Sequence, residues 1–242
     1  MPEAALIQPA LTADSRLIVA LDVPTVEEAR ALVDGLGEAV SFYKVGLELL
    51  ATGGMAFARE LKAQGKQVFL DWKLHDIGTT VQRAAAAIAA EGCGDFITVH
   101  GEPQVMASAV RGRGASGLKV LAVTVLTSLD EADLQEMGYP KTTVRALVER
   151  RIHQAIAAGC DGVVSSPREA DLARAIGGKD FLVVTPGVRP DWSAKNDQAR
   201  AATPLDALKA GASHVVIGRP ITAANDPQAA AVRIAGEMAQ AR

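Results

Sequence analysis

Two carboxylates and one ammonium group, those of Asp71, Lys73 and Asp76, fall within six positions in the stretch "FLDWKLHDIGTTV", residues 69–81, where an apolar run is ending. Asp71 and Lys73 are two positions apart, so on an extended strand their side chains project to the same side. Asp76 follows beyond the run, in a turn, and need not point the same way. Two carboxylates and an ammonium group at this spacing are typical of a reaction centre rather than of a hydrophobic core.

Further charged residues stand near the ends of the two preceding apolar runs. Asp22 ends the run "RLIVALDV", and Lys44 lies late in "FYKVG". If these runs are neighbouring parallel strands of a barrel, their carboxyl ends bring alternating charges to one rim. The carboxylates have the oxygen ligands that Mg²⁺ takes, but Lys73 already supplies a cation between Asp71 and Asp76. The pattern therefore predicts no metal at this site.

Three aromatic residues near these charges are expected to play supporting parts. Trp72 faces away from Asp71 and Lys73 because side chains alternate along a strand, so we expect it to pack in the core. His75 is expected to form hydrogen bonds within its loop. His100 ends the run "DFITVH" and is expected to lie behind the residues that contact a ligand.

A second group of residues predicts a phosphate site. "TPGVRP" follows the seventh apolar run, and the eighth leads directly into "IGRPIT". Gly187 and Gly218 allow backbone N–H groups to approach an anion closely. The guanidinium groups of Arg189 and Arg219 can each hold a phosphate through two hydrogen bonds. These residues indicate a small phosphorylated substrate.

The polar segment 190–204 follows this predicted phosphate site. A long segment with little structure of its own is often an active-site lid, and Gln198 within it is a candidate contact to the ligand. The sequence contains no motif for a cofactor, so we expect none.

The elements that must position these residues form a regular series. The glycine-closed helical patterns between the runs are typical of alternating helices and strands. Eight runs are largely apolar, as in parallel strands buried on both faces: 16–23, 42–46, 67–73, 95–100, 118–126, 161–166, 181–188 and 213–218. The series predicts an α/β fold, a single (β/α)₈ TIM barrel over residues 16–242, after a short N-terminal tail at 1–15. An open doubly wound sheet is the alternative, although "LDVPTVEEA" lacks the glycines of a dinucleotide site.

Composition limits the function classes. The chain has 242 residues, of which 49% are hydrophobic, and a formal net charge of −3, which argues against a general nucleic-acid-binding surface. No apolar run reaches the roughly 18 residues of a membrane span, and the N-terminus does not resemble a signal peptide. Cys93 and Cys160 are expected to be buried free thiols. These features predict a cytoplasmic protein without nucleic-acid or membrane partners.

The motifs together resemble the orotidine 5′-monophosphate decarboxylase family over almost the whole chain. The segments "LDV", "YKVG", "DWKLHDIGTT", "TVLTS", "TPGVRP", "NDQAR" and "IGRPIT" occur in the family's order. The most specific element is D-x-K-x-x-D-I-x-x-T with K-x-G upstream. The resemblance implies decarboxylation of orotidine 5′-monophosphate to UMP and CO₂, the last step of pyrimidine nucleotide synthesis. It implies a (β/α)₈ homodimer that uses no metal, cofactor or covalent intermediate.

The resemblance also implies a role for each residue of the charged network. Its members match Lys44, Asp71, Lys73 and Asp76. Lys73 matches the proton donor, which delivers its proton to C6 after CO₂ has left a carbanion there. Asp76 and Thr80 match residues that enter the active site of the partner subunit and reach the ribose.

Substrate contacts are implied in the same way. Asp22 and Lys44 match contacts to the ribose hydroxyls, and Thr127, at the end of the fifth strand, matches the residue that recognises the pyrimidine. The phosphate and lid contacts match Arg189, Gln198, Gly218 and Arg219.

The sequence departs from the family pattern at two places, and two alternative functions remain to be considered. "DIGTT" replaces the more usual "DIPNT", and Asn196 stands where the family often has Asp, which leaves the dynamics of the lid in question. One alternative is a Mg²⁺-dependent sugar-phosphate decarboxylase of the same superfamily, in which a Glu typically stands where this chain has Lys44. The other is a phosphate-ligand-binding barrel without catalysis, which has no use for so charged an array.

Overall fold

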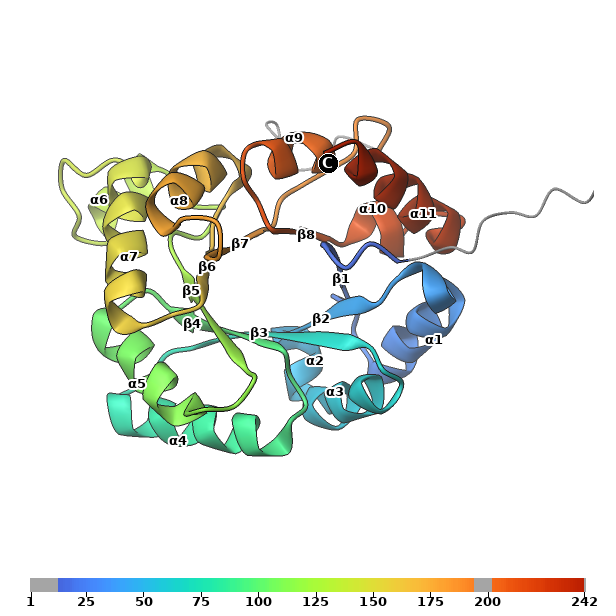
Figure 1. The fold of residues 1–242 in the computed structure, drawn as a ribbon, viewed down its shortest axis with the longest axis horizontal. Coiled ribbons are helices and arrows are strands. Elements are labelled where there is room, and N and C mark those ends of the chain that lie inside the picture. Colours follow the sequence, from blue (N-terminus) through green and yellow to red (C-terminus); the bar gives the residue numbers. More distant parts are fainter. Residues whose placement is uncertain (1–12, 194–201, 242) are drawn as a thin grey trace, which may run out of the picture.

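Eight parallel strands pair in chain order, and β1 also pairs with β8, so the sheet closes into a barrel (Figure 1). The computed structural model describes residues 13–193 and 202–241. The strands are β1 Leu17–Ala20, β2 Phe42–Gly46, β3 Gln67–Leu74, β4 Phe96–His100, β5 Lys119–Val123, β6 Gly162–Val164, β7 Leu182–Thr185 and β8 His214–Ile217. The predicted single (β/α)₈ barrel is confirmed, and the open sheet is wrong. A boundary between tail and barrel at residue 16 stays a prediction.

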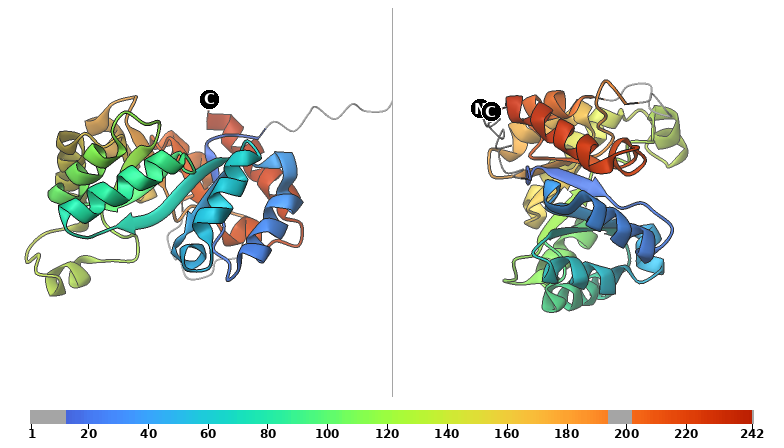
Figure 2. Two further views of the ribbon diagram at one scale, coloured as in Figure 1. Left: turned by 90° about the horizontal axis from the view of Figure 1, so that it is seen from below. Right: turned by 90° about the vertical axis from the view of Figure 1, so that its right-hand side faces the viewer.

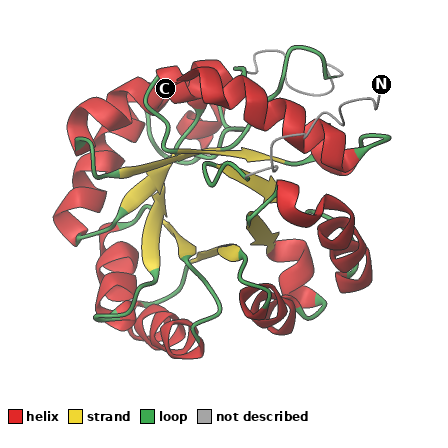
Figure 3. Ribbon diagram, turned by 45° about the vertical axis from the view of Figure 1, so that its right-hand side comes forward, coloured by secondary structure: helices red, strands yellow, loops and turns green. Residues whose placement is uncertain are grey.

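Helices cover the outer side of the barrel (Figure 3). Those that follow the first four strands are α1 Val26–Leu36, α2 Leu47–Ala51, α3 Gly54–Ala63, α4 Gly78–Glu91 and α5 Pro103–Arg113. The remainder are α6 Glu131–Glu136, α7 Val144–Ala158, α8 Ala170–Gly177, α9 Pro204–Lys209, α10 Arg219–Thr222 and α11 Pro227–Met238. The segment with α6 projects beyond the barrel at one end (Figure 2). No helix in the described ranges is long and apolar enough to cross a membrane.

The connectors before alternate strands hold the amino-terminal end of the barrel together. Gly92 and Gly159 end α4 and α7 with left-handed backbone, which glycine adopts without steric cost. The next polar side chain in each connector then accepts a backbone hydrogen bond from an earlier strand. Asp95 accepts from β3 at 2.7 Å, Asp161 from β5 at 2.9 Å and Ser213 from β7 at 2.9 Å. The repeated connectors therefore link strands that are neighbours in the barrel.

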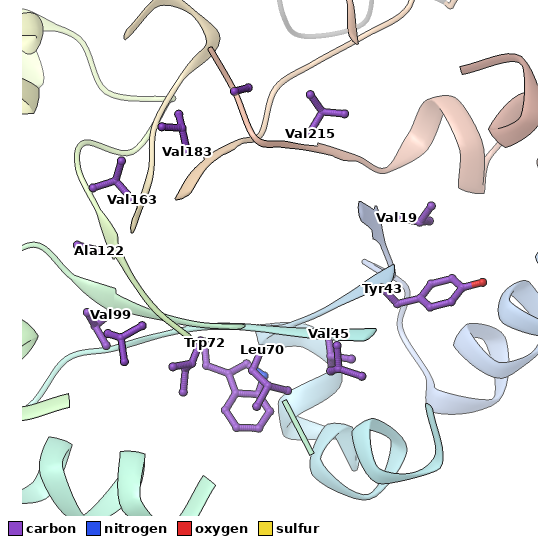
Figure 4. Close-up of a cluster of buried hydrophobic side chains, with 14 of the residues drawn as sticks. Val19, Tyr43, Val45, Leu70, Trp72, Val99, Ala122, Val163, Val183 and Val215 are labelled. Atoms are coloured by element: carbon purple, nitrogen blue, oxygen red, sulfur yellow. The ribbon is translucent and has the colours of Figure 1, made fainter. Parts of the chain in front are cut away.

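The apolar side chains form two layers, one on each side of the sheet. The outer layer lies between strands and helices, and Figure 4 shows Val19, Tyr43, Trp72 and Val215 directed away from the barrel axis. Trp72 is 6% exposed in this layer, so its predicted packing role is confirmed. The inner layer consists of Ile18, Ala20, Phe42, Phe69, Phe96, Leu121, Val184 and Val216. Both cysteines are buried and free, as predicted.

Candidate active site

Four charged side chains from the loop after β1 and from strands β2 and β3 meet at the carboxyl end of the barrel. Lys44 Nζ lies 2.7 Å from Asp22 Oδ1 and 3.6 Å from Asp71 Oδ2, and Lys73 Nζ donates to Asp71 Oδ1 at 2.9 Å. The order Asp22, Lys44, Asp71, Lys73 alternates in sign, and all four line one cavity of about 540 Å³. The structure thus brings together four of the predicted site residues, although β1 ends at Ala20 and Asp22 lies in the loop that follows.

Burial and ion pairing act in opposite directions on the pKa of Asp71, the carboxylate between Lys44 and Lys73. Lys44 is 7% exposed, and the Asp71 side chain is 16% exposed. Burial by itself raises the pKa of Asp71. The charges of Lys44 and Lys73, with hydrogen bonds from Lys73 and Thr98, outweigh burial and hold the pKa of Asp71 below its ordinary value. Asp71 is therefore a carboxylate near neutral pH.

The backbone of β3 is irregular where it presents Lys73. The register with β4 shifts between Leu70 and Leu74, and Lys73 has a φ of 49°, in the left-handed region. A bulge of this kind re-aims a side chain near a functional site. Strand alternation predicts that Asp71 and Lys73 share a side. They do meet, but through a left-handed residue rather than a regular strand.

Thr98 belongs to the cluster and was not predicted from the sequence. Its hydroxyl accepts a hydrogen bond from the Lys73 backbone N–H at 2.9 Å and donates to Asp71 Oδ1 at 2.9 Å. It is fully buried on β4. Threonine is common in strands, so the residue type alone does not indicate a functional role. Its position two residues before His100 is the available signal, because the two then share the inward side of β4.

Gly46 makes room for the first ion pair of the cluster. A Cβ at this position would lie 2.7 Å from Asp22 Oδ1 and 3.0 Å from Lys44 Nζ. Any larger residue would displace one of the two charges. The K-x-G spacing of "YKVG" is the sequence signal for this close approach, although Gly46 was not among the predicted site residues.

The predicted phosphate residues line the same cavity, in the segments that follow β7 and β8. Gly187, Arg189, Gly218 and Arg219 all contribute to its wall. Gly187 has a φ of 75°, a conformation that favours glycine. Gln198, like Asn196, lies outside the described residues.

A second lobe of about 240 Å³ opens from the charged cluster toward β5 and β6. Lys44, Asp71 and Lys73 line both this lobe and the larger cavity. The rest of its wall is uncharged and includes the hydroxyl-bearing side chains Thr127, Ser128 and Ser165. Thr127 lies in the loop after β5, which ends at Val123, and not at the end of the strand as predicted.

Asp76 and Thr80 do not reach this cluster within their own chain. Both are exposed, and neither is among the described residues that line the 540 Å³ cavity or the 240 Å³ lobe. Asp76 Oδ1 accepts a hydrogen bond from the Ile77 backbone N–H at 2.6 Å. The next side chain, Ile77, is 71% exposed. The turn after β3 therefore presents an acid and an apolar side chain outward.

The two predicted supporting histidines lie side by side at the rim. The ring centroids of His75 and His100 are 4.6 Å apart. His75 Nε2 lies 3.6 Å from Glu102 Oε2. Burial lowers the pKa of His100, which favours its neutral form. In the described part of the chain, neither ring lines the 540 Å³ cavity or the 240 Å³ lobe.

Within the described ranges, no group of three or more His, Cys, Asp or Glu side chains is arranged to hold a metal ion. The two carboxylates of the cluster, Asp22 and Asp71, have the ammonium group of Lys44 between them.

Comparison with known proteins gives consistent relatives. Residues 15–234 match the family described as "Orotidine 5'-phosphate decarboxylase / HUMPS family". The orotidine 5′-phosphate decarboxylase of Caulobacter sp. (strain K31) is 70% identical over 229 residues, which are 95% of this chain and 99% of that protein. The protein of the same name from Rhodopseudomonas palustris (strain HaA2) is 54% identical over 94% of this chain and 96% of its own length. The crystal structure of orotidine 5′-phosphate decarboxylase from Lactobacillus acidophilus superposes with a TM-score of 0.81 at 38% identity, covering 93% of this chain and 99% of that one.

Proposed function

Because this chain belongs to the orotidine 5′-phosphate decarboxylase / HUMPS family, we propose that it decarboxylates orotidine 5′-monophosphate to UMP and CO₂. The observation that carries the proposal is the position of the charged cluster. It lies between a lobe lined by uncharged and hydroxyl-bearing side chains and a cavity wall with two arginines and two glycines. A nucleotide offers a polar ring, a ribose and a phosphate in that order.

The phosphate is proposed to bind at the wall formed after β7 and β8. Arg189 and Arg219 offer guanidinium groups, and Gly187 and Gly218 leave the backbone accessible to the anion. Loops after the seventh and eighth strands of such barrels often form phosphate sites. Gln198 is proposed to contribute from the segment outside the described residues. Binding energy from the phosphate, remote from the reacting carbon, then helps to assemble the site.

The pyrimidine is proposed to occupy the smaller lobe. Thr127 and Ser128 can donate and accept hydrogen bonds at the edge of the ring, while the apolar Phe69 and Val123 contact its faces. A ring in this lobe has the Lys44–Asp71–Lys73 cluster on one side, and the ribose falls between the lobe and the phosphate wall. In this position the ribose hydroxyls are proposed to bind Asp22 and Lys44.

The chemistry needs a cation at C6 of the ring. Loss of CO₂ leaves a carbanion in the ring plane, where π delocalisation cannot readily spread the charge. A preorganised ammonium group in a dry site stabilises such a charge far more than it does in water. Lys73 is proposed to supply that cation and then its proton. Asp71 holds Lys73 at 2.9 Å and stays ionised because its pKa is lowered.

A homodimer is proposed to complete the site. Asp76 and Thr80 are exposed on their own chain, and the exposed Ile77 stands between them in sequence. An apolar side chain that is 71% exposed next to a turn with an outward carboxylate suits a subunit contact. In the proposed dimer, this turn places Asp76 and Thr80 of each subunit at the ribose of the other.

The structure favours this reaction over a Mg²⁺-dependent one. An enediolate mechanism needs ligands for the metal at the rim of β2, where this chain has Lys44. The Lys44 ammonium lies within 3.6 Å of both carboxylates of the cluster and so takes the place that a divalent cation would need.

The test is turnover of orotidine 5′-monophosphate by the purified protein, followed as loss of the orotate absorbance, with and without EDTA. We expect complete conversion to UMP at the same rate in both buffers. Loss of activity in EDTA would support the Mg²⁺-dependent alternative, and binding of nucleotide without conversion would support a non-catalytic barrel.

A further inference from the structure

Thr98 connects the backbone and the side chain of Lys73 through one hydroxyl group. The Lys73 N–H donates to Thr98 Oγ1 at 2.9 Å, Thr98 donates to Asp71 Oδ1 at 2.9 Å, and Lys73 Nζ donates to the same oxygen at 2.9 Å. These three hydrogen bonds form a closed ring that holds both ends of Lys73. Thr98 itself is absent from the walls of both lobes in the described part of the chain.

The backbone at Lys73 needs such a constraint. A φ of 49° is uncommon for a residue with a long side chain and costs on the order of 1–3 kcal/mol, so it persists only where the surroundings impose it. The register shift against β4 places Lys73 beside Thr98 rather than in a regular ladder. The Thr98 hydroxyl therefore replaces a strand hydrogen bond at the residue where the strand departs from regular geometry.

The direction of each hydrogen bond is fixed by its partners. A backbone N–H can only donate, so Thr98 Oγ1 accepts from Lys73 and its own proton is directed to Asp71. Asp71 Oδ1 then has two donors, Thr98 and Lys73, while Oδ2 faces Lys44 at 3.6 Å. The rotation of the Asp71 carboxylate is thereby set, and with it the position of the Lys73 ammonium.

We propose that Thr98 is a positioning residue that fixes the left-handed backbone of Lys73 and the orientation of Asp71, so that the Lys73 ammonium is held where the reaction needs it. This role rests on the proposed decarboxylase function, since Lys73 is the proton donor in that reaction. Thr98 acts through its two partners and has no contact with substrate in this role.

The test compares two substitutions of Thr98 with a matched control. Thr98→Val keeps the branched shape and removes the hydroxyl, whereas Thr98→Ser keeps the hydroxyl. Thr185 is equally buried, on β7, and its hydroxyl has no hydrogen-bond partner among the described atoms, so Thr185→Val removes the same group without breaking a bond. Each variant is assayed for kcat and KM with orotidine 5′-monophosphate and for stability in urea.

We expect Thr98→Val to lower kcat by about 10- to 100-fold, because a misplacement of about 1 Å in a catalytic group costs about that much. KM should change by less than about threefold, since the phosphate and ring contacts are intact. Thr98→Ser should recover most of kcat, and Thr185→Val should match the wild type. A Thr98→Val enzyme with wild-type kcat, or a Thr98→Ser enzyme as slow as Thr98→Val, would overturn the proposal.

A crystal structure of Thr98→Val separates this inference from the proposed function. If the wild type does not convert orotidine 5′-monophosphate, the proposed function fails, but the geometry still tests Thr98. The proposal requires that Lys73 leaves the left-handed region or that its Nζ moves out of hydrogen-bond distance of Asp71 Oδ1. An unchanged Lys73 in the variant would overturn it.

Discussion

Titratable side chains lie at two levels of the barrel interior. The surroundings favour the charged form at one level and the neutral form at the other. At the mouth, burial raises the pKa of Asp71, but the charges of Lys44 and Lys73 and two hydrogen bonds outweigh burial and hold this carboxylate ionised. At the amino-terminal end, His214 packs edge-on against Phe42 and Phe96, with ring centroids 5.8 and 5.2 Å away. Burial there lowers the pKa of His214 to about 4, so it is neutral near pH 7. Burial is common to both levels, and the partners decide the charge.

The two levels are expected to serve different purposes: the charged cluster at the mouth serves catalysis, and the buried histidine at the amino-terminal end serves stability. A charged cluster in a partly dry cavity interacts strongly with charge that develops on a ligand. A neutral imidazole among phenyl rings contributes to core packing. Because it has no net charge, it leaves the electrostatic field at the mouth unchanged. Changes at the mouth should therefore alter catalysis, and changes at the amino-terminal end should alter the pH dependence of folding.

Among substitutions of Asp71, Arg219 and His214, removing the charge of Asp71 should have the largest effect. In Asp71→Asn, the ammonium groups of Lys44 and Lys73 face each other without the anion between them. We expect kcat/KM to fall by about 100- to 1000-fold, the usual loss for a preorganised electrostatic contact, measured by steady-state kinetics at pH 7. Asp34→Asn on the exposed face of α1 is the control and should be unchanged. A wild-type rate in Asp71→Asn would show that pairing at the mouth is not used in catalysis.

Arg219→Ala should weaken substrate binding by a smaller factor. Loss of one charge-assisted contact to the phosphate should raise KM by about 10- to 100-fold. On orotidine, which lacks the phosphate, added phosphite dianion should increase wild-type turnover, because it occupies the same wall. Arg30→Ala, which removes an exposed pair with Glu60 on the outside of the barrel, serves as the control. If KM is unchanged in Arg219→Ala and phosphite does not increase turnover of orotidine, the proposed phosphate site is wrong.

His214→Phe should leave activity near the wild-type value and change only the pH dependence of stability. The folded pKa of about 4 lies below the ordinary 6.5, so the unfolded chain binds the proton more readily. Stability from the neutral ring is complete above pH 6.5 and is lost as the pH falls toward 4. Between pH 7.5 and pH 4.5, the wild type should lose about 2–3 kcal/mol more of its unfolding free energy than His214→Phe in urea titrations. Equal losses would mean that His214 is not held neutral.

The strands and the order of the charged residues were predictable because they follow from simple patterns. Strands buried on both faces read as apolar runs, and each of the eight runs coincides with a strand, although β3 extends one residue beyond its run, to Leu74. The meeting of Asp22, Lys44, Asp71 and Lys73 follows from the rule that functional residues lie at the carboxyl ends of barrel strands.

The remaining features depend on geometry that residue types do not encode. The left-handed Lys73 violates strand alternation, and no rule of spacing predicts it. Thr98 looks like an ordinary strand residue until its hydroxyl is seen between Asp71 and Lys73. His214 is the same residue type as the histidines of the rim. The sequence does not show that phenyl rings surround it, and this burial is what favours its neutral form. Gln198 lies outside the described residues, so its role stays a prediction.

The ammonium group of Lys73 at the mouth is proposed to perform the chemistry. The most direct test is conversion of orotidine 5′-monophosphate by Lys73→Ala beside the wild type, with binding of UMP measured for both. We expect no measurable turnover in Lys73→Ala and a UMP affinity within about tenfold of the wild type, because the ring and phosphate contacts remain. A Lys73→Ala protein that still produces UMP at a comparable rate would contradict it.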